Sequence, residues 1–430
     1  MFITIITVIL ALSFLIFIHE LGHYLAAKKV GVHVMEFSIG FPPKVFSRII
    51  GKTEYIISLI PIGGYVRLKG QSIDDEDTSD PENYAAKSAL ERLFILVAGP
   101  LMNLLVALVL MPLVFYIGYE IPAYLNEAPV IGSVDPGSKA EILDIKRDDL
   151  ILAINDKDVS TWKEAQSQIL SSKEPIILVK IRRGQEIGHR ALNSGYFSAP
   201  EGIGWHARIT PVIGKISPNS PAENAGLQLD DNLIEINNVK IYDWSQISPI
   251  IQNSNGNPVS FVIDRNGQRK EYMISPTLED EYNYWIIGIS SKTEQVSENF
   301  TNSITLGAKR VYYLTTRTFV FLFRLITGQE KSDSVGGPIM IAKMMGQAAQ
   351  TSISSLLTLV AFISLQFCIF NLLPIPALDG GHVLFLVIEK ISGKTLSKSL
   401  RLSIQRIGFS LLMFLILYIS VQDGLRLFGN

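Results

Sequence analysis

Two histidines and a glutamate stand close together near the start of the chain, in the pattern His19-Glu20-Leu21-Gly22-His23. On a helix, residues four apart lie on one face, so His19 and His23 could hold one metal ion. Glu20 would point about 100° away around the helix axis, where it can reach an attacking water without being a ligand. The pattern H-E-x-x-H is typical of zinc metalloproteases.

The surroundings of this pentapeptide are apolar. Between residues 2 and 18 the only polar side chains are those of Thr4, Thr7 and Ser13. Ionisable side chains within a membrane helix are costly, and they usually mark a working site. We therefore expect a metalloprotease that acts inside a lipid bilayer. The segment has no basic N-terminal region and no A-x-A cleavage site, so we expect a retained helix rather than a signal peptide.

The composition agrees with a membrane protein that carries substantial soluble parts. Of 430 residues, 48% are hydrophobic and only 18% are charged, and the mean hydropathy is +0.29. Soluble domains usually have about 25% charged residues. The net charge of −2 gives no indication of nucleic-acid binding. The single cysteine, Cys368, excludes an internal disulfide and a multi-cysteine zinc site.

Four segments are long and apolar enough, or nearly so, to cross a bilayer. They are residues 2–25, 93–119, 355–373 and 407–421, the last extendable to 428. Positive charge predicts their orientation, because Lys and Arg accumulate in cytoplasmic loops. Basic residues follow the first span and separate the third span from the fourth: Lys28, Lys29, Lys44, Arg48, Lys52, Lys390, Lys394, Lys398, Arg401 and Arg406. Both termini and the region between the second and third spans are therefore expected outside, with the H-E-x-x-H pattern near the cytoplasmic face.

The outside region contains an internal repeat. Residues 129–162 align without a gap with residues 211–244, and thirteen of the 34 positions are identical. A repeat of this length indicates two copies of one small domain. Each copy is expected to form a short strand, a turn, a short helix and a second, apolar strand. The second copy has Gly226 after its helix where the first has Asp144, so the helix-to-strand turn of the first copy is expected to differ.

These copies resemble PDZ domains in the circularly permuted form of bacterial proteases. Such domains bind chain ends or extended segments by strand addition beside an apolar groove. The alternative is that both copies exclude bulky substrates and bind no peptide. After them, residues 318–326 are apolar but too short to span a membrane, so an amphipathic or packed helix near the membrane surface is expected.

A catalytic zinc ion usually has three protein ligands and an open position, so a third ligand should come from another segment at membrane depth. Asp379 is the strongest candidate, because it follows the third apolar span in a stretch where Pro374 and Pro376 prevent a regular helix. The two glycines after it would allow close approach of the backbone. As alternatives, Asp379 could cap a helix that begins near His382, or His382 could itself be the ligand.

In type and order, these residues resemble those of the site-2 protease family of intramembrane zinc metalloproteases. The stretch HELGH near the N-terminus and the stretch NLLPIPALDGGH near the C-terminus carry the resemblance. The paired PDZ-like insert resembles the bacterial regulator of sigma-E protease branch of that family. Further matches are Gly99-Pro100 and Asn103 in the second span and the sequence PIGGYV at residues 61–66. The resemblance covers essentially the whole chain.

The resemblance implies that His19, His23 and Asp379 bind Zn²⁺. It also implies that Glu20 is the general base, which takes a proton from water and passes it to the leaving amine. Asn103 is expected to be structural.

Other residues are implied to contact the substrate. Asn371 would be a substrate-holding amide, for which a hydrogen bond between packed helices is the alternative. Residues 55–69 are rich in β-forming side chains, and in the family this region is a hairpin that enters the membrane. An exposed strand edge there could hold an extended substrate by main-chain pairing, unless the sheet merely plugs the cavity. The implied substrate-binding residues are Gly63, Gly64, Tyr65, Asn371, Pro374 and Pro376.

Together these features predict a polytopic α-helical membrane protein with four transmembrane helices, a membrane-associated β-hairpin or sheet, and two inserted α+β PDZ-like domains. The expected bounds are 1–27, 93–119, 355–389 and 407–428 for the transmembrane helices, 28–92 and 390–406 for cytoplasmic loops, 120–203 and 204–292 for the PDZ-like domains, and 293–354 for a periplasmic juxtamembrane helical region.

By resemblance, the chain is expected in the bacterial inner membrane, with its termini and PDZ-like domains in the periplasm. Its expected substrates are single-pass membrane proteins already trimmed on the periplasmic side, such as an anti-sigma factor, and the PDZ-like domains would admit only trimmed substrates. Alternatives are clearance of remnant signal peptides, or a non-catalytic membrane scaffold that works through its PDZ-like domains. A metal transporter is disfavoured, because the repeat lies outside the spans.

Overall fold

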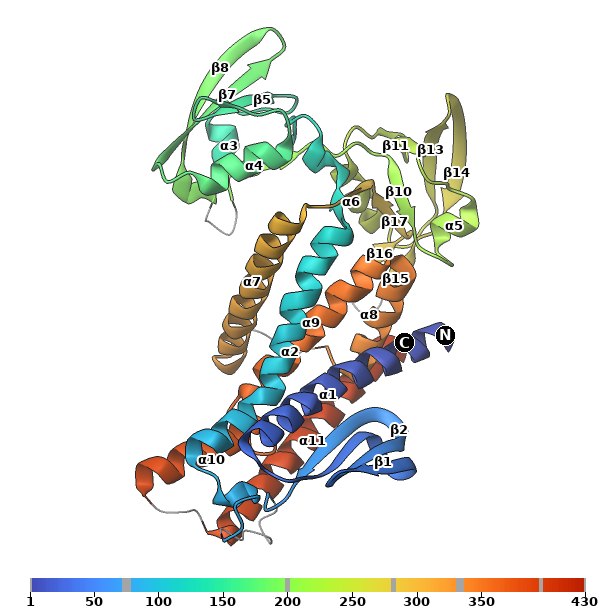
Figure 1. Ribbon diagram of the computed structural model, residues 1–430. Coiled ribbons are helices and arrows are strands. Elements are labelled where there is room, and N and C mark those ends of the chain that lie inside the picture. Colours follow the sequence, from blue (N-terminus) through green and yellow to red (C-terminus); the bar gives the residue numbers. More distant parts are fainter. Residues whose placement is uncertain are drawn as a thin grey trace. The chain divides into compact units, whose positions relative to one another are not determined.

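The computed structural model describes residues 2–71, 79–197, 202–279, 284–329, 336–393 and 397–428. They form two compact units, one made of the chain up to Tyr119 together with the chain from Ser297 onward, and the other running from Glu120 to Val296. Within the first unit, one folded sheet packs against the N-terminal helix, and the second unit holds small antiparallel sheets (Figure 1). Lys394, one of the basic residues of the expected last loop, lies outside the described residues.

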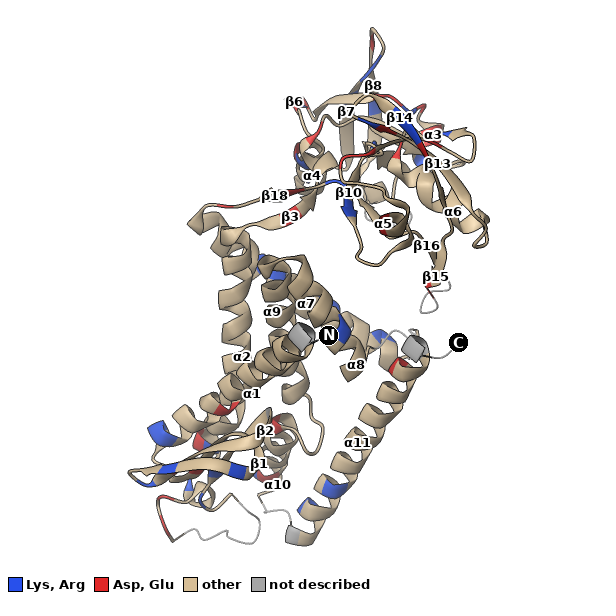
Figure 2. Ribbon diagram, turned by 90° about the vertical axis from the view of Figure 1, so that its right-hand side faces the viewer, with Lys and Arg blue, Asp and Glu red and all other residues tan. Residues whose placement is uncertain are grey.

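Four helices among the described residues are long and apolar enough to cross a membrane, as the sequence predicted. They are α1 (Phe2–Val30), α2 (Ala89–Ile117), α9 (Ile353–Leu372) and α11 (Lys398–Phe428). Figure 2 shows long stretches of α1 and α2 without charged residues. Only 6% of the apolar stretch of α11 is buried within the protein. Apolar surface of this extent is typical of contact with lipid.

Helix α2 is the central element of the first unit, and it contacts α1, α9 and α7 (Phe300–Ile326). It begins with a capping box, in which Ser88 Oγ accepts the backbone N–H of Glu91 and the Glu91 carboxylate accepts the backbone N–H of Ser88. Helix α7 packs closely against it, because a Cβ at Gly307 would lie 2.5 Å from the ring of Pro112. The predicted short helix at 318–326 is thus the last part of a longer packed helix.

A buried carboxylate connects the last helix to α8 (Pro338–Thr351). Asp423 of α11 is fully buried, and it accepts the backbone N–H groups of Gly337 and Met340 at 3.1 and 3.0 Å. These donors belong to the N-terminus of α8, where unsatisfied N–H groups favour a negative charge. Asp423 therefore fixes one end of α11, whose remaining surface is mostly exposed. The helix α10 (Asp379–Ser392) follows α9 after a short irregular connection.

The sheet of the first unit consists of two long, bent strands, β1 (Val34–Ile50) and β2 (Thr53–Leu68). Residues 34–41 pair on one side with residues 64–68 and on the other side with residues 54–60, and residues 44–50 pair beyond them. The two strands therefore form four segments in the order 64–68, 34–41, 54–60 and 44–50. The two central segments run parallel to each other, and each outer segment runs antiparallel to its neighbour. Among the described residues, no further strand pairs with 64–68, so this segment is a free edge. The far segments carry exposed apolar side chains: Phe41, Val45, Phe46, Ile49, Ile50, Ile57, Leu59 and Ile60.

In the second unit, the two copies of the repeat have the same order of elements. The first copy consists of β4 (Ile131–Val134), α3 (Lys139–Ile142), β5 (Leu150–Ile154), β6 (Lys157–Asp158), α4 (Trp162–Ser171), β7 (Ile176–Arg183), β8 (Glu186–Asn193) and β9 (Trp205–Ala207). The second consists of β10 (Ile213–Ile216), α5 (Pro221–Ala225), β11 (Asn232–Ile236), β12 (Val239–Lys240), α6 (Ile247–Asn253), β13 (Val259–Arg265), β14 (Gln268–Ile274) and β17 (Ile289–Ser291). The four-stranded sheets have the matching orders β6-β5-β7-β8 and β12-β11-β13-β14.

Each copy encloses its own apolar core. The largest fully buried side chains include Ile151 and Ile181 in the first copy and Phe261 in the second. Of the remaining strands, β3 (Tyr119–Pro122) pairs with β18 (Thr293–Val296), and β15 (Thr277–Glu279) pairs with β16 (Tyr284–Ile286). Short 3₁₀ helices are Tyr84–Ala86, Ala123–Asn126, Ser194–Phe197 and Trp244–Gln246.

The prediction that the helix-to-strand turn of the first copy differs from that of the second is wrong. Asp144 has a φ of 53° and Gly226 has a φ of 89°, so both turns use the left-handed region. Aspartate tolerates this conformation better than most residues. The carboxylate of Asp144 also pairs with Lys146, Arg183 and Arg190 at 2.9 to 3.0 Å. Hydrogen bonds from Lys146 and Arg183 lower the pKa of Asp144 to about 2, so the carboxylate is charged at neutral pH.

Candidate metal centre

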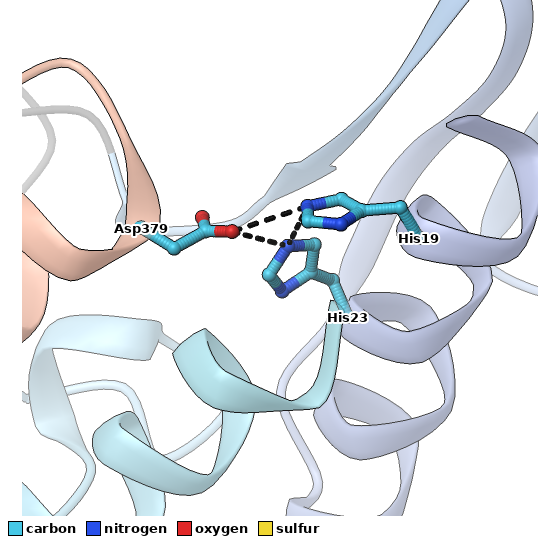
Figure 3. Close-up of side chains that lie close together, drawn as sticks. All are labelled: His19, His23 and Asp379. Atoms are coloured by element: carbon cyan, nitrogen blue, oxygen red, sulfur yellow. Dashed lines mark hydrogen bonds and ion pairs between the residues drawn. The ribbon is translucent and has the colours of Figure 1, made fainter. Parts of the chain in front are cut away.

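The side chains of His19, His23 and Asp379 converge on one point (Figure 3). His19 and His23 lie one turn apart on α1, and Asp379 is the first residue of α10. The two Nε2 atoms are 3.2 Å apart, and Asp379 Oδ2 lies 3.1 Å from Nε2 of His19 and 3.5 Å from Nε2 of His23. The structure thus brings together the three residues that the sequence predicted as ligands.

The ring of His23 is held by the backbone of α2. Its Nδ1 lies 2.8 Å from the carbonyl oxygen of Ile95. Because a carbonyl only accepts, Nδ1 carries the proton, and a neutral ring then presents a lone pair on Nε2. This is the arrangement that a metal-binding histidine needs.

Asp379 is presented by a sharp bend between α9 and α10. Pro374 and Pro376 lie in this bend, and Ala377 has a φ of 94°. The following glycines permit close packing, because a Cβ at Gly380 would lie 2.1 Å from the carbonyl oxygen of Leu373. Helix α10 begins at Asp379 itself, so the alternative that Asp379 caps a helix beginning near His382 is wrong.

The donor set fits a zinc ion. Ligands at 2.0–2.1 Å from a tetrahedral zinc lie about 3.3 Å from each other, and the three separations here are 3.1, 3.2 and 3.5 Å. Asp379 Oδ2 is buried and makes no hydrogen bond. A cation placed between these two imidazole nitrogens and the carboxylate oxygen would be stabilised by all three lone pairs. Nitrogen and carboxylate donors with an open side are the usual catalytic zinc set.

Glu20 lines the same cavity as these three residues. The cavity has a volume of about 300 Å³, and its wall also includes Tyr65, Val66, Asn371 and His382. Val66, which lies on the free edge of the sheet, lines the cavity together with Glu20. The carboxylate, the candidate ligands and an unpaired strand edge therefore share one space.

The predicted substrate-binding residues divide into two groups. Tyr65 and Asn371 line the cavity, although the Asn371 amide also donates to the Phe367 carbonyl of its own helix at 2.9 Å. Gly63, Gly64, Pro374 and Pro376 are not among the residues that line the cavity. At Gly64, a Cβ would lie 2.8 Å from the Ser38 carbonyl and 3.5 Å from Glu20 Cγ.

Two glycines that received no individual role from the sequence allow α1 and α2 to meet at the site. A Cβ at Gly22 would lie 2.4 Å from the carbonyl oxygen of Ala98. A Cβ at Gly99 would lie 2.3 Å from Nε2 of His23 and 2.8 Å from Nε2 of His19. The sequence did mark both positions, because Gly22 lies inside H-E-x-x-H and Gly99 belongs to the matched residues of the second span. Their role in letting α1 and α2 approach each other is shown only by these distances in the folded structure.

We expect Gly99→Ala to remove metal binding without unfolding the protein. The new methyl group would occupy the space beside both Nε2 atoms, whereas alanine is a better helix former than glycine. Zinc content after purification in detergent should fall well below one ion per chain, with helical circular dichroism unchanged. Gly424→Ala is the control, because a Cβ there meets nothing within 4 Å. Full zinc occupancy in Gly99→Ala would contradict the geometry described.

Comparison with known proteins identifies the family. The model of peptidase family M50 matches residues 7–415. The regulator of sigma E protease of Haemophilus influenzae is 31% identical over 97% of this chain and 98% of its own length. The zinc metalloprotease RasP of Geobacillus kaustophilus is 30% identical over 99% and 98%, and the regulator of sigma-E protease RseP of Escherichia coli is 30% identical over 98% and 97%. The chain therefore belongs to peptidase family M50 and is a zinc metalloendopeptidase.

Proposed function

We propose that this zinc metalloendopeptidase cleaves the transmembrane segments of single-pass membrane proteins, in regulated intramembrane proteolysis. The observation that carries the proposal is the convergence of His19, His23, Asp379 and Glu20 on one cavity in a unit whose helices are long and apolar enough to span a membrane. A hydrolytic site enclosed by such helices can act on bonds that soluble proteases do not reach.

In this proposal His19, His23 and Asp379 hold Zn²⁺ through Nε2, Nε2 and Oδ2. When bound, the ion polarises the scissile carbonyl and activates water near neutral pH. His382 lines the cavity, but it lies outside the cluster of three found among the described residues. We therefore favour Asp379 over His382 as the third ligand.

Glu20 acts as the general base in the proposed reaction. It takes a proton from the attacking water and passes it to the leaving amine. Its position one residue after His19 places it beside the ligands, and it lines the same cavity as Val66 of the sheet edge. The carboxylate can therefore meet water on one side and an extended peptide on the other.

The free edge of β2 holds the substrate. A peptide bond within a helix is shielded by its own hydrogen bonds, so the substrate must be extended before attack. Residues 64–68 pair with β1 on one side only, and Val66 lines the same cavity as Glu20. Main-chain pairing along this edge would place an extended segment directly against the cavity. Asn371 lies in the wall of the cavity and can contact the same segment.

The substrate class and orientation follow from the relatives and the charge pattern. Two of the relatives above are named for regulation of sigma E, so the proposed substrate is an anti-sigma factor that has lost its periplasmic part. The basic residues after the first span and before the fourth favour an inner-membrane protein with both termini and the repeats in the periplasm. Clearance of remnant signal peptides would use the same chemistry on the same class of segment.

The two repeats, which we propose are PDZ-like domains, act as a size filter. Each has a compact core and a four-stranded sheet of the same order. The pair β3–β18 closes the base of the inserted region. A filter of this kind would delay cleavage until a substrate has been shortened.

Glu20→Gln should reduce proteolysis of a single-span substrate by about 10²–10⁴-fold, because the amide cannot accept the proton. Zinc content should stay at the wild-type level, since Glu20 is outside the cluster of three candidate ligands. The assay uses protein purified in detergent and follows product by gel. Glu186→Gln, at an exposed position of β8, is the matched control. Equal cleavage by Glu20→Gln and wild type would exclude the proposed mechanism.

Val66→Pro should slow cleavage at least about tenfold, the effect of losing one main-chain hydrogen bond of roughly 1.4 kcal/mol. Proline removes the N–H of Val66, which lies on this edge of the sheet and in the wall of the cavity. Val66→Thr keeps the backbone N–H and has a side chain of similar shape. Its cleavage rate should stay close to that of the wild type. The strand-edge role fails if Val66→Pro, loaded with zinc, cleaves as fast as Val66→Thr.

Deletion of residues 127–290, joined by a short linker, should make full-length and trimmed substrates almost equally good. The deletion leaves β3 and β18 in place, together with the bond from the Ala123 N–H to the Lys292 carbonyl. The ratio of the two cleavage rates is the measurement, and cleavage of the trimmed substrate shows that the site is intact. An unchanged ratio would rule out the filter.

A further inference from the structure

Asn103 of α2 is a fully buried polar side chain beside the candidate metal centre. Its Nδ2 lies 3.2 Å from Nδ1 of His19, and its Oδ1 has no hydrogen-bond partner. A buried amide with one unsatisfied atom costs free energy. A side chain that served only packing at this position would be apolar, so the contact with His19 is the feature that needs an explanation.

The direction of this hydrogen bond decides whether His19 can bind a metal. If the amide nitrogen donated to Nδ1, the neutral ring would carry its proton on Nε2, which faces Asp379 and His23. That proton would block the ligand position. Oxygen and nitrogen of a carboxamide exchange places by a half-turn that moves no other atom. With Oδ1 toward the ring, the amide accepts Nδ1–H and leaves a lone pair on Nε2.

One face of α2 then serves both histidines. Ile95, Gly99 and Asn103 are spaced four residues apart, so they lie along one side of the helix. The Ile95 carbonyl accepts Nδ1–H of His23, and Gly99 leaves space beside the two Nε2 atoms. The Asn103 side chain is placed to do for His19 what the Ile95 carbonyl does for His23.

A third helix holds Asn103 in place. The hydroxyl of Ser364, on α9, donates to the backbone carbonyl of Asn103 at 2.8 Å, and Ser364 is fully buried. Because α9 leads into the bend that presents Asp379, this bond connects the helix that orients His19 with the segment that supplies the carboxylate.

We propose that Asn103 is a positioning residue whose Oδ1 accepts Nδ1–H of His19 and so keeps Nε2 of His19 free to bind zinc. The proposal rests on the zinc site proposed above and goes beyond the structural role that the sequence predicted for Asn103. Partners that orient a metal-binding histidine in this way typically contribute 10- to 100-fold to metal affinity or activity.

Two nearly isosteric substitutions separate this role from packing. Asn103→Leu removes the acceptor, and it should weaken zinc affinity by roughly 10–100-fold. Asn103→Asp offers only acceptor atoms to His19, so its affinity should stay within a few-fold of wild type. Zinc affinity is measured by competition with a chromophoric chelator on the full-length protein in detergent. The melting temperature of the zinc-free protein is the second measurement, and Asn103→Leu should not lower it, because leucine removes an unsatisfied amide.

The outcomes are distinct. Wild-type affinity in Asn103→Leu would overturn the positioning role. Equal loss in Asn103→Leu and Asn103→Asp would also overturn it, because the amide would then be needed as a donor. A lowered melting temperature of zinc-free Asn103→Leu together with unchanged zinc affinity would assign Asn103 to packing. Failure of the wild type to bind zinc would instead overturn the proposed metal site on which this inference rests.

Discussion

The meeting of one carboxylate and two imidazoles inside an apolar helical unit is the interaction on which the rest of this structure depends. Removing charged groups from water costs several kcal/mol each, and the cost is offset only by good pairing. Asp379 Oδ2 reaches both Nε2 atoms within 3.5 Å, so α1 and α10 must approach closely at this level. Gly22 and Gly99 allow α2 to approach as well, and its Ile95 carbonyl receives the proton of His23.

Backbone N–H and C=O groups without partners are a second constraint, and it concerns the bend before Asp379 and the edge of β2. Irregular backbone at membrane depth is tolerated only where protein or a water-filled cavity covers it. The proline-containing bend before Asp379 lies against the cavity, with Ala377 and Leu378 in its wall. The edge of β2 faces the same cavity through Val66. An edge that is open toward a catalytic centre and closed elsewhere by β1 suits a substrate that must be bound in extended form.

The second unit does not depend on this interaction, since each copy of the repeat has its own apolar core and its own buried ion pair. Asp149 and Arg183 in the first copy correspond to Asp231 and Arg265 in the second, and both Asp carboxylates are fully buried. A repeated fold of this kind can change at its surface without affecting the metal centre. The turn at Asp144 is an example, because ion pairs there support a conformation that the second copy obtains from glycine.

Local spacing in the sequence determined the helix with His19, Glu20 and His23, the four apolar helices, the bend at Pro374 and Pro376, and the repeat, because each depends on residues close in the chain or on direct alignment. Asp379 could be chosen from the sequence only as a carboxylate in a broken segment, with His382 as a rival. Three features depend on tertiary packing and could not be predicted from spacing. The segment 34–41 of β1 pairs on both sides and leaves 64–68 as a free edge. Gly99 leaves room for the two imidazole rings, and Asn103 contacts His19 across 84 positions of the chain. These contacts join segments far apart in sequence, and their distances are set by how closely the helices can approach.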